Sequence, residues 1–113
     1  MTSAEVNPSM LRLLGTGDWD TLKELIETGA YNDMIHDNSK MLAIIIFAVN
    51  FEAPVEILHL MCNLNPDALM IEDTPFRLAR QQGCSAQTIT VLEAARQFAL
   101  SRKFNDSTSS LNF

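Results

Sequence analysis

The segment Thr74-Pro75-Phe76-Arg77-Leu78-Ala79-Arg80-Gln81-Gln82-Gly83 contains a full set of helix signals. Threonine followed by proline is typical of a helix start, because the hydroxyl can cap the helix and proline fits its first turn. Phe76 and Ala79 lie three residues apart and therefore share one helical face. Gly83 can adopt the left-handed conformation that ends a helix. The segment predicts a helix of about two turns, which is too short to be stable without neighbours.

A pair of short helices is predicted close to the N-terminus. Asn7-Pro8 begins the first helix, which ends at Gly15-Thr16-Gly17, and Asp18 caps the second helix, which ends at Gly29. Apolar residues recur in both at helical spacing: Met10, Leu11, Leu13 and Leu14 in the first, and Trp19, Leu22, Leu25 and Ile26 in the second. The segment therefore predicts a helix-turn-helix unit.

The middle and the end of the chain predict further helices. The run from Lys40 to Asn50 follows a cap at Asn38 or Ser39 and is apolar on nearly every side, so we expect it to be buried all round. Pro54 begins a helix, and one more turn is expected at residues 68–70. The inner side of the Pro54 helix carries Val55, Ile57, Leu58, Leu60, Met61 and Leu64. Ser85 caps the last and longest helix.

Three of these segments resemble the ankyrin repeat. The stretch from Thr74 to Gly83 is similar to the Thr-Pro-Leu-His-Leu-Ala…Gly signature, with Phe76 in place of the first leucine and Arg77 in place of the histidine. Residues 17–30 resemble the second half of a repeat, with both glycines in register. Residues 53–69 resemble a divergent variant that we associate with repeat proteins of algae such as diatoms.

The spacing of the three segments agrees with this resemblance. Leu13, Ala48 and Ala79 occupy equivalent positions, separated by 35 and 31 residues, which bracket the ~33 residues of an ankyrin unit. The resemblance implies an all-α fold: a short solenoid of three helix-turn-helix repeats at residues 8–37, 38–70 and 71–104, with a longer C-terminal helix. Residues 1–104 would form one domain and residues 105–113 a flexible polar tail. It also implies a projecting β-turn finger at residues 31–39. Before Thr74 the sequence departs from the family, because the usual glycine is missing and the finger is shortened, so a β-turn is not predicted there.

Composition narrows the class of partner and the compartment. The net charge of −6 disfavours binding to nucleic acid, and the longest apolar run, from Met41 to Val49, is too short to span a membrane as a helix. The N-terminus has no secretory signal, and two cysteines are too few for a disulfide scaffold. We expect an intracellular protein, cytoplasmic by default, although a removed transit peptide would leave no trace.

One set of residues suggests metal or nucleophilic chemistry. His59 and Cys62 share a helical face, and Cys84 and His36 are the only other soft ligands available. Zinc needs four ligands in one place, and a Cys-His nucleophile needs an oxyanion hole and an orienting acid, which the sequence does not indicate. We therefore expect no metal, no cofactor and no catalytic residue, and we keep a metal-binding protein or Cys/His enzyme as the alternative.

Two regions are candidates for binding another protein. Trp19 begins an outer helix, where a partly exposed tryptophan would be a contact residue, and otherwise it packs over the first repeat. The finger supplies Met34, Ile35, His36 and Asp37. Apolar side chains in a projecting loop need a cover, which is either this domain or a partner.

Arg77 and Arg80 are the third candidate contact. The ankyrin resemblance places them on the side of a first helix that faces the concave groove, where they would bind an acidic segment of a partner. The alternative is that they pair with Glu72 or Asp73. The sequence thus predicts a non-catalytic protein-protein interaction module, or a small structural subunit of a larger assembly. Besides the enzyme, the other alternative is a homo-oligomer that covers its own apolar ends.

Overall fold

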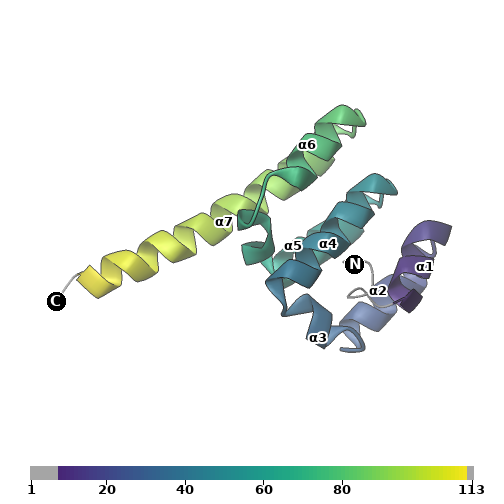
Figure 1. The fold of residues 1–113 in the computed structure, drawn as a ribbon, viewed down its shortest axis with the longest axis horizontal. Coiled ribbons are helices and arrows are strands. Elements are labelled where there is room, and N and C mark those ends of the chain that lie inside the picture. The colour runs from purple at the N-terminus through teal and green to yellow at the C-terminus, as the bar shows by residue number, and fades with distance from the viewer. Residues whose placement is uncertain (1–7, 112–113) are drawn as a thin grey trace.

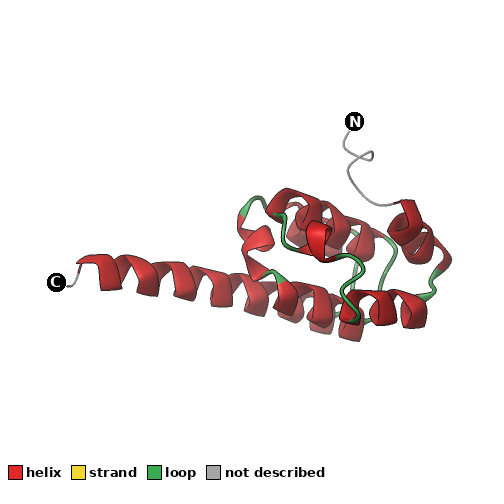
Figure 2. Ribbon diagram, turned by 90° about the horizontal axis from the view of Figure 1, so that it is seen from below, coloured by secondary structure: helices red, strands yellow, loops and turns green. Residues whose placement is uncertain are grey.

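The computed structural model describes residues 8–111, and side chains up to Arg102. The described residues form helices and connecting turns and contain no strand, so the all-α prediction is confirmed (Figures 1 and 2). The elements are α1 (Pro8–Thr16), α2 (Trp19–Glu27), α3 (Asn32–Ile35), α4 (Asn38–Asn50), α5 (Val55–Leu64), the 3-10 helix η2 (Pro66–Met70), α6 (Thr74–Gln81) and α7 (Ala86–Leu111).

Side-chain caps set several helix starts. The Asp18 carboxylate accepts a hydrogen bond from the backbone N–H of Thr21 (3.4 Å), as predicted. The cap of α4 is different from the prediction, because Asp37, rather than Asn38 or Ser39, accepts a bond from the N–H of Lys40 (3.1 Å). The side chain of Ser85 caps α7 by accepting from the N–H of Thr88. Asn7, the predicted cap of α1, lies outside the described residues.

The signals at α6 are confirmed in outline and corrected in one detail. Gly83 has φ +68°, the left-handed conformation expected after a helix end. Phe76 and Ala79 are both buried, as expected for residues on one face. Thr74, however, is already the first helical residue and Asp73 is the N-cap, so Thr74 does not cap the helix. Its hydroxyl instead donates to the Glu72 carboxylate.

The helices pack in two rows. α1 packs on α2, α4 on α5, and α6 on α7, and α4 lies between α1 and α6 (Figure 1). We call α1, α4 and α6 the first row, and α2, α5 and α7 the second row. Within the second row, α5 packs against α7. α7 also runs along η2 and projects past the other helices (Figure 2).

A single hydrophobic core lies between these elements. The largest fully buried side chains come from both rows and from the connecting turns: Phe76, Met10, Leu14, Leu22, Ile35, Met41, Ile44, Ile45, Leu58, Met61, Leu69 and Leu92. Helices of this length are marginal in isolation, so most of their stability must come from this shared burial.

The segment at residues 31–39 departs from the predicted β-turn finger. It forms the short helix α3, in which Met34 and Ile35 turn inward and are 8% and 1% exposed. Burial of two large apolar side chains favours this conformation over a projecting turn.

Leu64 is more exposed than the sequence predicts. The prediction places its side chain on the inner side of α5, whereas the side chain is 42% exposed.

The C-terminal segment continues as helix further than the predicted domain. α7 extends through Leu111, past residue 104. Residues 112 and 113 of the predicted polar tail lie outside the described residues, and the flexibility of the tail remains a prediction.

Asn65 connects the end of α5 to the start of α4. It lies between α5 and η2, is 8% exposed, and donates from Nδ2 to the carbonyl oxygen of Ile35 (2.7 Å) and to Oδ1 of Asn38 (2.9 Å). These bonds join the end of α5 to the junction of α3 and α4. Because the amide is buried, both bonds exist in place of bonds to water.

We predict that Asn65→Ala lowers the free energy of unfolding by about 1–3 kcal/mol, since it removes two hydrogen bonds at a buried site. Urea denaturation followed by circular dichroism measures the change. Asn63→Ala is the matched control, because Asn63 is exposed and its side-chain amide bonds to the exposed ring of His59. Equal effects of the two substitutions would contradict the role given to Asn65.

Candidate protein-binding surface

The predicted finger residues separate into buried and exposed groups. Met34 and Ile35 belong to the core, so the domain itself covers them and they are not available to a partner. His36 is exposed at the end of α3, and Asp37 is exposed while it caps α4. Trp19 is half-buried and packs against the core. Of these residues, His36 and Asp37 are the most accessible.

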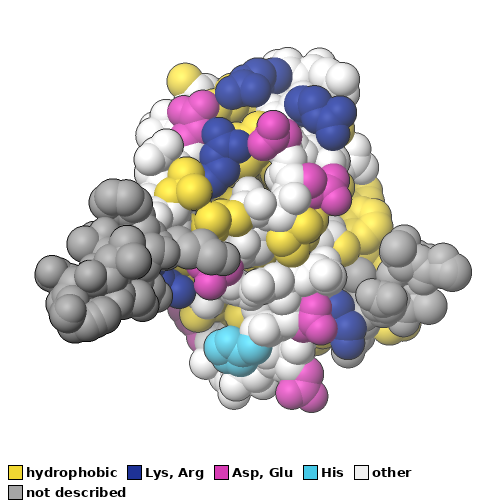
Figure 3. Space-filling view, turned by 60° about the vertical axis from the view of Figure 1, so that its left-hand side comes forward, with side chains coloured by type: hydrophobic (Ala, Val, Ile, Leu, Met, Phe, Trp, Pro, Cys, Tyr) yellow, Lys and Arg dark blue, Asp and Glu magenta, His cyan; other side chains and the backbone are white. Residues whose placement is uncertain are grey.

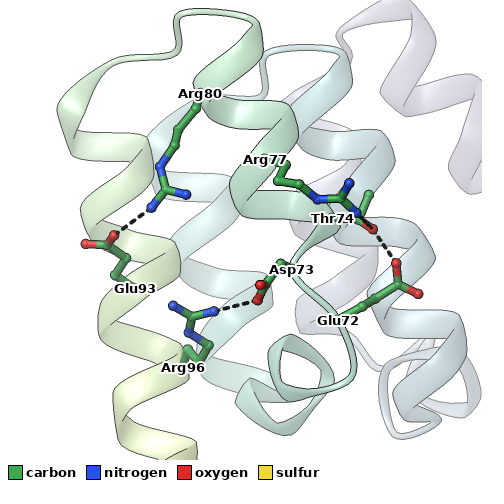
Figure 4. Close-up of polar contacts among 7 residues, drawn as sticks. All are labelled: Glu72, Asp73, Thr74, Arg77, Arg80, Glu93 and Arg96. Carbon is green, nitrogen blue, oxygen red and sulfur yellow. Dashed lines mark hydrogen bonds and ion pairs between the residues drawn. The ribbon is translucent and has the colours of Figure 1, made fainter.

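Ion pairs join α6 to α7. Arg80 Nη2 lies 3.4 Å from Glu93 Oε2, and Arg96 Nη1 lies 2.9 Å from Asp73 Oδ1 (Figure 4). The guanidinium carbon of Arg96 is also 4.0 Å from the centroid of the Phe76 ring, a cation–π distance. In Figure 3, Lys and Arg side chains gather with acidic side chains among them at the α6–α7 end of the molecule. This end of the core is therefore covered by paired charges.

The two predicted binding arginines differ in their contacts. Arg80 pairs with Glu93, whereas Arg77 Nη2 donates only to Thr74 Oγ1 (3.3 Å) and makes no ion pair among the described residues. Figure 4 shows Arg77, Thr74 and Glu72 on the side of α6 that faces α4. Neither arginine pairs with Glu72 or Asp73, the partners that the alternative prediction named.

One side of α4 is open, although the sequence predicts burial on every side. Met41, Leu42, Ile44, Ile45, Ala48 and Val49 are buried. Ala43, Ile46 and Phe47 are only half-buried. They lie in a groove of ≈ 350 Å³, which we call the α4 groove and which is lined by Ser39, Leu42, Ala43, Ile46, Phe47, Ile71 and Glu72. The helix thus presents an apolar surface that its own domain does not cover.

Exposed hydrophobic residues extend this surface at both ends. The Phe51 ring is 41% exposed and stacks on Phe47, with 6.5 Å between centroids and 18° between planes. Ile71 is 46% exposed and forms part of the groove wall beside Glu72. Continuous apolar surface rimmed by polar residues is typical of a protein-binding site.

The candidate metal ligands and nucleophiles are distributed over separate places. His59 and Cys62 line a groove between α5 and α7, but Cys62 is 1% exposed. Cys84 lines a different groove, between the α4–α5 and α6–α7 turns, and His36 lies on α3. Across the described residues, no three His, Cys, Asp or Glu side chains are grouped so as to hold a metal ion. The positions of these four residues therefore do not support the alternative prediction of a single metal or Cys/His site built from them.

Among the described helices, none combines the length and the apolar character that crossing a bilayer requires.

Comparison with known proteins gives no relative for this chain. No family model, no curated protein and no solved structure matches it.

The two thiols should differ in reactivity. Burial raises the pKa of Cys62 to about 12, so at pH 8 about one thiol in ten thousand is ionised, whereas Cys84 is half-buried. We predict that a thiol reagent such as DTNB modifies Cys84 first in the native protein and reaches Cys62 only after unfolding. Mass spectrometry of peptides identifies the modified residue, and equal rates at both cysteines would contradict the burial of Cys62.

Proposed function

We propose that this chain is a non-catalytic protein-interaction module, an ankyrin-like stack of three helix pairs that docks another protein on the α4 groove. The observation that carries the proposal is the open apolar side of α4. A soluble domain normally covers such a helix, and here Ala43, Ile46, Phe51 and Ile71 remain accessible. A partner that covers them would gain about 25 cal/mol for each Å² of apolar surface removed from water.

The arrangement of the helices supports the repeat assignment. Each helix of the first row packs on the next helix in sequence, and each pair touches mainly its neighbouring pair, as expected of a solenoid. The Thr-Pro helix ends at a left-handed Gly83, in agreement with the quoted signature. A solenoid of this kind presents its first row as a surface on which side chains vary without cost to the core.

The α6–α7 end supports a terminal role for the last repeat. Arg96 covers Phe76 and pairs with Asp73, and Arg80 pairs with Glu93, so charged pairs cover the part of this end around Phe76. Terminal repeats with a polar outer face are required for solubility in solenoids. Exposed large hydrophobic side chains lie beside the α4 groove, at Phe51 and Ile71, and also on the second row, at Leu64, Phe98 and Leu100.

An enzyme is the weaker candidate. A nucleophilic cysteine needs thiolate character and access, and burial raises the pKa of Cys62 to about 12. His59 is exposed and its ring nitrogens lie 3.4 Å from the Asn63 amide, rather than next to an orienting acid. We therefore assign no catalytic role to either residue.

The docking surface can be tested with two matched substitutions. We predict that Ala43→Gln, which fills the α4 groove without adding charge, abolishes recovery of the partner in quantitative affinity purification with the full chain as bait. Ala94→Gln introduces the same change on an exposed position of α7, in the groove that contains His59. This control should recover the partner as well as wild type does.

Two results would contradict the proposal. One is a partner set that is unchanged by Ala43→Gln, and the other is a set lost with Ala94→Gln instead, which would move the interface to the second row. Circular dichroism melting curves of both variants establish that folding is retained before the comparison is made.

A further inference from the structure

The first row of helices carries basic residues and no acidic ones. α1, α4 and α6 contain the four basic residues Arg12, Lys40, Arg77 and Arg80 and no acidic residue. The second row carries both signs: α2 contains Asp20, Glu24 and Glu27 with Lys23, α5 contains Glu56, and α7 contains Glu93 with Arg96 and Arg102. The first row is therefore basic in a chain whose net charge is −6. A partner that approaches this row meets cations that net charge alone would not indicate.

Two of these cations, Lys40 on α4 and Arg77 on α6, have no acidic partner among the described residues, and the groove between them is lined by α4 and by Ile71 and Glu72 of the turn before α6. Lys40 follows Ser39, a lining residue, and uses its backbone N–H to complete the cap of α4. Arg77 lies on the side of α6 that faces α4 and contacts Thr74 (Figure 4). A guanidinium has five donors, so that single contact leaves Arg77 capacity to bind a carboxylate. By contrast, Arg80, Arg96 and Arg102 each form an ion pair with an acid of this chain.

One acidic side chain lines the groove, and its contacts reduce its influence. Glu72 accepts a hydrogen bond from the Thr74 hydroxyl, and the same hydroxyl accepts one from Arg77. The Glu72 charge is thus placed next to the Arg77 charge, within a chain of three bonded residues. The acids of α2 lie on a helix of the second row and do not line the groove.

We infer that the segment docked in the α4 groove is acidic: it places a bulky apolar side chain between Ala43, Ile46 and Ile71, and carboxylates against Lys40 and Arg77. This inference rests on the proposed docking function and specifies the partner's chemistry. The apolar contact supplies most of the affinity, whereas the two cations select the sign of charge and the register. A basic segment of the same apolar content would bring like charges together and is rejected.

The test uses random peptides in place of the unidentified partner. A phage-displayed library of short random peptides is selected on the immobilised full chain and counter-selected on the Ala43→Gln variant. We expect the groove-dependent peptides to combine a large apolar residue with Asp or Glu and to carry net negative charge. A groove-dependent pool that is neutral or basic, or the absence of any such pool, would overturn the inference.

A matched pair of variants then tests the two cations. The best selected peptide is titrated by fluorescence anisotropy against the full chain. Lys40→Gln/Arg77→Gln should raise Kd roughly tenfold, as expected for the loss of two exposed charge pairs. Lys23→Gln/Arg102→Gln removes the same charge from second-row helices and should change Kd by less than about twofold. Equal effects of the two double variants would overturn the assignment of Lys40 and Arg77.

The outcomes separate this inference from the docking proposal. Basic peptides that are lost on Ala43→Gln would retain the groove as a docking site and reject an acidic partner. Peptides that bind Ala43→Gln and wild type equally would reject the groove itself.

Discussion

The shared hydrophobic core between the two rows of helices is the constraint on which the rest of this structure depends. Helices of nine residues, such as α1 and α2, or of eight, such as α6, are not stable in isolation. Each becomes stable by burying one face against the opposite row, so the helices, their caps and the turns between them form together. The same dependence fixes where polar groups are required, as Asn65 shows where it joins the end of α5 to the start of α4. For the same reason, an apolar helix face that no other helix covers is notable. Such a face stays exposed to water, and it is a candidate for contact with another protein.

Much of the fold could be predicted from local signals. Proline and glycine at the ends of α6, the aspartate before α2 and the serine before α7 are read directly, because they act within one turn of their own position. The helix α3, which is found where a projecting finger was expected, could not be predicted from local signals. Met34 and Ile35 turn inward because distant residues bury them. The caps of α4 and α6 were each misplaced by a residue or two, since several adjacent residues can cap equally well and packing selects among them.

The candidate site was predicted less well than the fold, for a related reason. The apolar composition of α4 indicates a buried helix, but composition does not state how many neighbours a helix has, and α4 has neighbours on only part of its circumference. Arg77 and Arg80 look equivalent in sequence, yet the structure pairs Arg80 with Glu93 and turns Arg77 toward α4. The absence of acidic residues from α1, α4 and α6 is visible in the sequence, and it acquires meaning only when the packing places these helices in one row. The functional hypothesis therefore combines a sequence property with a spatial arrangement that the sequence does not state.

The most direct test of this account is the solvent exposure of three consecutive isoleucines on α4. Ile44 and Ile45 are fully buried, whereas Ile46 is half-buried at the α4 groove. With isotope-labelled isoleucine methyl groups, NMR relaxation in the presence of a soluble paramagnetic probe reports how closely the solvent approaches each one. The account predicts strong enhancement at Ile46 and little at Ile44 or Ile45. Equal protection of all three methyl groups would show that α4 is buried all round, and would remove the surface from which the function is inferred.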